Sequence, residues 1–181
     1  MTELMEEKGL EGITVSDLTE KADISRGTFY LHYKDKYDLL EQSESDFFNY
    51  IQDVVNPEKE ILIGLSPEDL KEPFPFLIAL FTYIQEHADF LKVNLGPKGN
   101  PSFQSDLKNM MKTKLLENIL THVKKDDMLV PEDYLTAYLA SAHLGVVQHW
   151  LENGMEVSPR DLALILSRTT FFGPAYVAGI R

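Results

Sequence analysis

Apolar residues recur every three to four positions along most of the chain, and no stretch alternates between apolar and polar residues for long enough to predict a sheet. This spacing predicts helices over residues 2–8, 14–22, 25–33, 35–56, 76–95, 102–125, 132–152 and 158–172. We expect about nine helices in all, with a bend near residues 87–89 and a break or kink at Gly173-Pro174. The pattern therefore predicts an all-α protein.

The first helices are bounded by residues that cap or turn the backbone. Thr14 and Asp17 have the spacing of a capping box, and Ser25 and Asp35 are good caps for the third and fourth helices. Asp23 lies where the chain must turn sharply, and aspartate tolerates a left-handed backbone better than most residues. Two short helices joined by such a turn have the size and spacing of a helix-turn-helix.

The composition excludes several kinds of chemistry. A chain of 181 residues can bury a core without a disulfide or metal, and the absence of cysteine rules out disulfides, thiolate zinc sites and thiol catalysis. No apolar run approaches the ~20 residues needed to cross a bilayer, and no signal peptide precedes the first helix-like pattern. We therefore expect a cytoplasmic protein that makes no membrane contact.

The net charge argues at first against a nucleic-acid partner. Seventeen Lys and Arg residues against 29 Asp and Glu residues give −12, whereas binding to phosphates requires cations. The distribution changes this picture, because Arg26, Lys34 and Lys36 lie within a short stretch whose acidic residue is Asp35, and His32 lies between them. Residues 25–37 thus form a small basic segment in an acidic chain.

The same segment belongs to a longer motif. Glu7–Gly9, Ile13–Leu18, Ala22–Lys36 and Leu39–Leu40 together resemble, in order and without gaps, the signature of the TetR family of bacterial transcriptional regulators. The resemblance implies a three-helix DNA-binding head over residues 1–45. A long fourth helix would join this head to a ligand-binding and dimerisation bundle over residues 46–181. Only the last turns of the family's first helix precede the motif, so we expect either a truncated start or an unusually short head.

The resemblance also implies which residues contact DNA. Arg26 would meet base edges, because its guanidinium can donate two hydrogen bonds to guanine, and Lys36 would bind a phosphate together with the first amides of the fourth helix. Lys34 is expected to be a solvated loop residue. The head core is expected to contain Leu18, Ala22, Ile24, Phe29, Tyr33 and Leu40. The full set of DNA-binding candidates is Thr14, Ser16, Arg26, Thr28, Tyr30, His32 and Lys36.

The rest of the chain offers weaker signals. Its last two helices resemble the dimerisation pair of the family branch that includes regulators associated with dihydroxyacetone kinase genes, and the candidates for this contact are Ala137, Ser141, Gly145, Leu162, Leu166 and Thr169. An apolar ligand pocket is expected from Phe76, Phe81, Tyr83, Phe90, Phe103, Met110 and Met111, although each could be an ordinary core residue. No cofactor is expected, and no metal site, because His87, His122, His143 and His149 lie on three different helices.

Two functions remain open at this point. The first is a regulator, most often a repressor in this family, that binds a palindromic operator in double-stranded DNA as a homodimer and is released by an unknown small molecule. The second is a protein with the same fold that acts through a protein partner as an interaction protein or co-activator, with weak or lost DNA binding. An enzyme is not expected, because no nucleophile with a base, phosphate loop or metal-ligand spacing is present.

Overall fold

The computed structural model describes residues 1–55, 69–118 and 124–180, and these residues form nine α-helices without a strand. The helices are α1 Thr2–Gly12, α2 Val15–Lys21, α3 Arg26–His32, α4 Lys36–Val54, α5 Pro75–Glu86, α6 Ala88–Leu95, α7 Pro101–Asn118, α8 Glu132–Glu152 and α9 Pro159–Val177. The prediction of an all-α protein is confirmed. The end expected for the helix over residues 102–125 falls partly on residues that are not described.

Local sequence signals fix most of the helix ends. Thr14 and Asp17 form the predicted capping box, and Asp23 adopts the predicted left-handed conformation with φ of 52°. The bend expected near residues 87–89 separates α5 from α6 at His87. The helical conformation expected over residues 2–8 is interrupted at Gly9, as predicted. The φ of 68° at Gly9 places a kink there, after which α1 continues to Gly12.

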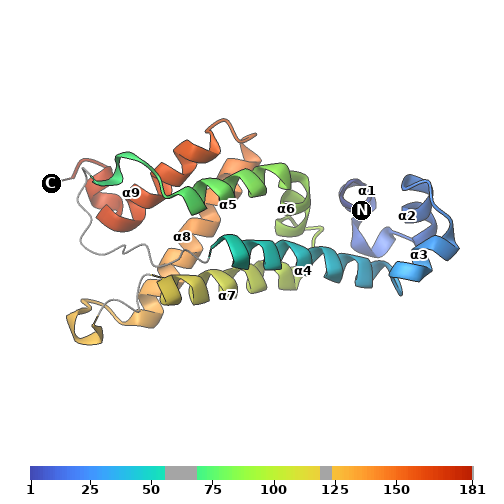
Figure 1. Cartoon of the computed structure of the whole chain (residues 1–181), viewed down its shortest axis with the longest axis horizontal. Coiled ribbons are helices and arrows are strands. Elements are labelled where there is room, and N and C mark those ends of the chain that lie inside the picture. The colour runs from blue at the N-terminus through green and yellow to red at the C-terminus, as the bar shows by residue number, and fades with distance from the viewer. Residues whose placement is uncertain (56–68, 119–123, 181) are drawn as a thin grey trace.

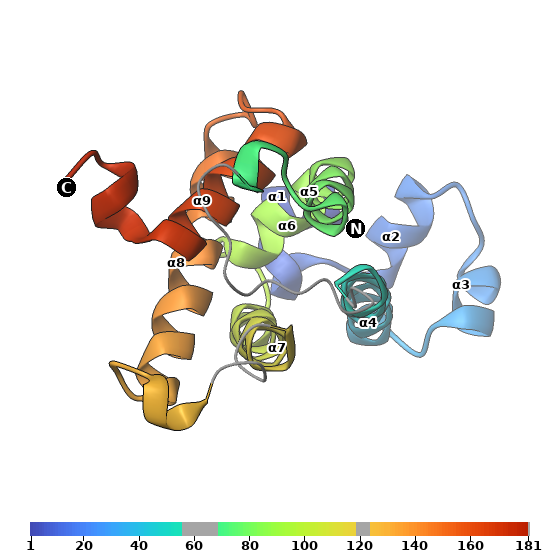
Figure 2. The same cartoon turned by 60° about the vertical axis from the view of Figure 1, so that its left-hand side comes forward.

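The helices form an elongated molecule with the N-terminal head at one end. Figure 1 shows α1 to α3 grouped at this end, and α4 runs from them into the body formed by the later helices. In the body, α5 packs against α9 and α7 packs against α8. Figure 2 shows the C-terminus on the opposite side of the molecule from α2 and α3. The long fourth helix therefore connects the two parts, as expected.

Two hydrophobic cores stabilise these parts. The body core is formed by residues of all six helices from α4 through α9 and includes Phe47, Phe81, Phe103 and Trp150. The head core contains Leu4, Met5, Ile13, Leu18, Phe29 and Leu40, and Val93 of α6 completes it. Each core residue of this kind contributes about 1.5–3 kcal/mol by its burial.

The predicted head core is partly wrong. Ala22 and Ile24 are both exposed, Ile24 by 41% of its surface. Both lie next to Asp23, where the left-handed turn leaves the helical path and carries their side chains to the surface. The helix α1 packs against α6 instead. Val93 of α6 thus contributes to the head core, in which the sequence had predicted Ala22 and Ile24.

Candidate nucleic-acid interface and internal pocket

The helix pair α2 and α3 is held in place by its caps. Thr14 Oγ1 accepts from the Asp17 amide at 3.2 Å, and its hydroxyl donates to Asp17 Oδ2 at 2.7 Å. The Lys8 ammonium lies 2.6 Å from Asp17 Oδ1, and this contact, with the hydrogen bonds from Thr14, keeps the pKa of Asp17 well below its ordinary value. Ser25 caps α3 by accepting from the Thr28 amide at 3.0 Å. These caps therefore fix the first turns of α2 and α3.

One face of α3 is buried and the other is open to solvent. Phe29 is 2% exposed and anchors the helix to the head core, whereas Tyr30 is 55% exposed. Tyr30 thus points outward, as its spacing from Phe29 predicts. The other DNA-binding candidates on this helix, Arg26, Thr28 and His32, are exposed as well. Because Arg26 and Tyr30 are four residues apart, they share one side of the helix.

The hydroxyl groups around α3 are partly engaged within the head. Thr28 Oγ1 lies 2.9 Å from Ser25 Oγ, and the Thr14 hydroxyl is part of the capping box. Thr14 and Thr28 are nevertheless exposed, and Ser16 is exposed on α2. The exposed surface thus combines a guanidinium, a phenol, an imidazole and three hydroxyls.

Lys36 does not present a free ammonium in this structure. Its Nζ donates to the carbonyl oxygens of Leu10, Glu11 and Ile13 at 2.9, 2.9 and 3.0 Å. An ammonium has three hydrogens, so these carbonyls use all of its donors. Lys36 therefore fastens the end of α1 to the start of α4.

The first amides of α4 are occupied too. The Asp35 carboxylate accepts from the amides of Tyr37 and Asp38, both at 2.9 Å. The phosphate site expected from Lys36 and these amides is thus filled by the head's own groups, and this part of the expectation is corrected. Exposed Lys34, which precedes the helix, is the cation that faces solvent here.

We expect Lys36→Met to lower the free energy of unfolding by about 1–3 kcal/mol, because three carbonyl groups at the end of α1 lose a charged donor. Urea unfolding measures the difference. The matched control is Lys34→Met, which removes an exposed ammonium two residues earlier and should stay within about 0.5 kcal/mol of the unchanged protein. Equal stabilities of the two variants would show that Lys36 has no such fastening role.

The body contains a cavity of about 170 Å³ between α4, α5, α6, α7, α8 and α9. Four of the seven residues expected to form an apolar pocket line it: Phe76, Phe81, Met110 and Met111. The other three, Tyr83, Phe90 and Phe103, do not line it, and this part of the expectation is wrong. They pack around Phe47 in an aromatic cluster on α4.

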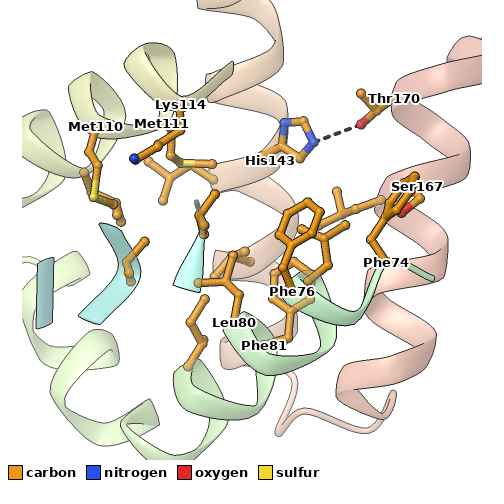
Figure 3. A pocket seen from close by; sticks show the side chains of 18 of the residues that line it. Phe74, Phe76, Leu80, Phe81, Met110, Met111, Lys114, His143, Ser167 and Thr170 are labelled. Carbon is orange, nitrogen blue, oxygen red and sulfur yellow. Dashed lines mark hydrogen bonds between the residues drawn. The ribbon is translucent and has the colours of Figure 1, made fainter. Parts of the chain in front are cut away.

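His143, Ser167 and Thr170 gather at one side of this mostly apolar cavity, and Lys114 of α7 also lines it. Figure 3 shows His143 of α8 facing Thr170 of α9, and Ser167 lies one turn earlier on α9. His143 Nε2 lies 2.9 Å from Thr170 Oγ1, and Nδ1 lies 2.6 Å from the Leu139 carbonyl oxygen. Burial lowers the pKa of the His143 imidazole. From the sequence, His143 was considered only as a metal ligand. A histidine, a serine and a threonine on two otherwise apolar helix faces could have indicated a polar site in the cavity wall.

The candidates for a dimer contact fall into two groups. Ser141 and Gly145 are exposed on α8, and Ala137 and Thr169 are partly exposed. In contrast, Leu162 and Leu166 are buried in the protomer, where Leu166 lines the cavity. These two leucines are therefore unavailable to a second copy, and their assignment is corrected. The same helices expose large side chains that the sequence reasoning did not single out, namely Tyr134, Tyr138, Ile165 and Tyr176.

Within the described residues, no group of three or more His, Asp or Glu side chains could hold a metal ion. His122 lies outside the part of the chain that is described. No helix among the described residues is both long and apolar enough to traverse a bilayer.

Comparison with protein families gives two matches. Residues 2–42 match the family described as bacterial regulatory proteins, tetR family. Residues 71–171 match the family described as transcriptional regulator C-terminal region. The first match contains the helix pair α2 and α3, and the second contains most of the cavity wall.

Curated relatives carry regulator names. An uncharacterised HTH-type transcriptional regulator of Bacillus subtilis, YxbF, is 23% identical over 163 residues, which are 88% of this chain and 40% of the relative. The biofilm operon icaADBC HTH-type negative transcriptional regulator IcaR of Staphylococcus epidermidis is 34% identical over 50 residues, or 28% of this chain and 27% of the relative. The chain thus spans less than half the length of these relatives.

Solved structures share the fold. The dihydroxyacetone kinase operon activator DhaS has a TM-score of 0.57 at 19% identity, with 99% of this chain and 90% of that chain covered. The regulator FadR of Bacillus subtilis, solved in complex with stearoyl-CoA, has a TM-score of 0.61 at 18% identity, with 95% of this chain and 94% of that chain covered. At these identities the likeness extends to the fold.

Proposed function

Since this chain belongs to the tetR family of bacterial transcriptional regulators, we propose that it binds a palindromic operator as a homodimer and represses transcription until a small molecule enters its cavity. The family matches and the regulator names of its relatives confirm the resemblance stated from the sequence and set the chain apart from enzymes. Operator, dimer, repression and ligand release are the parts that we propose. Binding to chromosomal DNA also places the protein in the bacterial cytoplasm.

The observation that carries the proposal is the exposed face of α3. Arg26 and Tyr30 are exposed on one side of this helix, and buried Phe29 anchors the helix to the head. The net charge of −12 disfavours contact with phosphates elsewhere on the molecule, so the basic segment around α3 is the surface that can approach DNA. An arginine at the start of an exposed helix is well suited to donate to guanine in the major groove.

A homodimer gives this small surface enough affinity. Two copies of α3 about 34–36 Å apart would enter successive major grooves of a site with two-fold symmetry. The exposed small residues Ser141 and Gly145 on α8 support such a dimer, because they allow a helix from a second copy to approach closely. The contacts that the two copies make with the two half-sites then contribute together to the affinity of one dimer for the operator.

The fourth helix links the cavity to the head. Phe47 and Ile51 of α4 line the cavity, and Leu40 of the same helix lies in the head core. Leu40 and Ile51 are eleven residues apart on α4, which corresponds to about 16 Å along the helix. A ligand that contacts Ile51 would therefore act on the same helix that holds the head through Leu40. Asn100 Nδ2 donates to both oxygens of Glu44 at 3.1 Å and holds the middle of α4 to the turn before α7. A coupling of about 1–3 kcal/mol between ligand and operator is typical for such an arrangement.

Two relatives bear on the ligand and on the sign of regulation. FadR, whose structure contains stearoyl-CoA, supports an apolar ligand for the cavity of this chain. The negative regulator IcaR supports repression, whereas DhaS is an activator. We favour repression because a dimer on DNA blocks the polymerase without needing a further contact. A reporter gene downstream of the operator should rise in output when the regulator is deleted.

A salt series tests DNA binding itself. We expect the logarithm of the operator association constant to fall with the logarithm of salt concentration by about 0.9 for each phosphate contact, so four contacts in a dimer give a slope of about −3.6. Fluorescence anisotropy of a labelled operator duplex measures this slope. A slope near zero, or equal affinity for operator and scrambled duplexes at low salt, would contradict the proposal.

The second candidate function is supported by Lys36. Because its ammonium is bound to three carbonyls and the chain carries a net charge of −12, a protein that acts through a protein partner remains the alternative. The same anisotropy titration separates the two functions, since an interaction protein of this kind would not distinguish operator from scrambled DNA.

A further inference from the structure

The cavity is apolar over most of its wall, and its few polar groups make specific demands on a ligand. His143, Ser167 and Thr170 lie together on α8 and α9, while the facing wall carries side chains such as Phe76, Leu80 and Met111 (Figure 3). Each of these three groups already has a hydrogen-bond partner within the protein, so a ligand can use only the hydrogen-bonding capacity that remains. The positions of their hydrogens decide which ligand this is.

The His143 tautomer follows from its two hydrogen bonds. The Leu139 carbonyl can only accept, so Nδ1 at 2.6 Å must carry the proton. Burial favours the neutral ring, which leaves Nε2 as a bare acceptor. Thr170 Oγ1, 2.9 Å from Nε2, therefore donates its hydrogen to His143.

The two hydroxyl groups of α9 that line the cavity consequently have no hydrogen left for a ligand. The Thr170 hydrogen points at His143, and the Ser167 hydroxyl donates to the Ala163 carbonyl oxygen at 2.7 Å. Both oxygens can still accept a hydrogen bond. A hydroxyl that already donates becomes a better acceptor, because hydrogen bonds in a chain polarise one another.

The volume limits the size of the ligand. The cavity measures about 170 Å³, and a cavity of about 150 Å³ lined by Leu, Ile and Phe is known to stay dry and to bind benzene. A single substituted benzene ring therefore matches this space, and its ring would contact the aromatic and methionine side chains of the facing wall.

We propose that the cavity binds a small apolar molecule of phenol size that carries one hydrogen-bond donor, and that this donor bonds to Thr170 Oγ1. Thr170 Oγ1 itself cannot donate to a carboxylate, which would have to pair with Lys114 elsewhere on the cavity wall. The role of this ligand as the signal that releases DNA rests on the proposed function, whereas its binding rests on the geometry of the cavity.

The test compares probes of nearly equal shape by calorimetry on the full chain. 4-Methylphenol is expected to bind about 10-fold more tightly than 4-methylanisole, in which a methyl group replaces the donated hydrogen. Equal affinity for the phenol and the anisole would overturn the proposal.

Two variants locate the donor's partner. Thr170→Ser keeps the hydroxyl and should keep the preference for the phenol, whereas the double variant Thr170→Val/His143→Phe removes both acceptors and should bring the phenol-to-anisole ratio close to 1. Toluene binding shows that the cavity persists in the double variant. Thr82→Val on α5 is the matched control, since the Thr82 hydroxyl bonds to the Ile78 carbonyl oxygen outside the cavity. A preference that survives in the double variant with toluene still bound overturns the proposal.

A parallel measurement on operator DNA keeps the two proposals apart. If 4-methylphenol binds with the expected selectivity and lowers operator affinity, the effector role is supported as well. If it binds with that selectivity and leaves operator affinity unchanged, the ligand class stands, and release of DNA by this cavity is contradicted.

Discussion

Arg26→Ala is expected to weaken operator binding of the homodimer by about 2–6 kcal/mol, because a guanidinium on guanine contributes about 1–3 kcal/mol and each dimer has two such contacts. Arg26 is exposed at the start of α3, so its removal leaves the head core intact. The variant should also lose its preference at one base pair in each half-site. Anisotropy titrations against the operator and against duplexes substituted at that position measure both effects.

Arg160→Ala is the matched control for this substitution. Arg160 is also exposed at the start of a helix, but it lies on α9 in the body, where it pairs with Glu72. Operator affinity should be unchanged in this variant. If Arg26→Ala and Arg160→Ala bind the operator equally well, α3 does not contact base edges through Arg26.

Gly145→Glu is expected to separate the dimer, raise its dissociation constant by at least about 100-fold and abolish operator binding at nanomolar concentrations. An uncompensated charge at the centre of an interface costs about 3–5 kcal/mol. The protomer itself has room for the change, since a Cβ at position 145 meets no atom within 4 Å and the backbone there is helical. Replacing a glycine inside a helix also removes an entropic cost of about 0.5–1 kcal/mol. Analytical ultracentrifugation measures the dimer, and thermal unfolding shows that the protomer stays folded.

Gly145→Ala controls for the backbone effect at the same position. It provides the same gain in helix propensity with a side chain that still fits between closely packed helices, so the dimer and operator binding should persist. If the Glu variant dimerises as well as the Ala variant, the exposed side of α8 around Gly145 is not the dimer interface.

Features determined by neighbouring residues could be predicted from the sequence. The capping box of Thr14 and Asp17 and the turn at Asp23 depend on backbone preferences that act over three or four residues. The outward position of Tyr30 follows from helical spacing once Phe29 is placed inside. The helix pair that carries the candidate DNA-binding face was therefore predictable in detail.

Features determined by packing between distant segments were not. Lys36 looks like a free cation in the sequence, and only the approach of α1 supplies the three carbonyls that bind it. Val93 is 5% exposed because it packs against the head, although more than fifty residues separate it from Leu40. Leu162 and Leu166 belong to an apolar stripe on one helix. The stripe alone does not show whether it packs against a second copy or against the core of its own chain. Aromatic residues likewise do not reveal whether they line a cavity or fill a core, which is why Phe103 was misplaced.

The most direct measurement is the sequencing of genomic fragments of the source bacterium that the purified protein retains, with Arg26→Ala as the parallel sample. We predict a shared inverted repeat whose half-sites are centred about one helical turn, or 10–10.5 base pairs, apart or a multiple of that distance. This motif should be enriched by the unchanged protein and not by Arg26→Ala. Retained fragments without a common motif, or the same fragments in both samples, would contradict the claim that α3 recognises an operator.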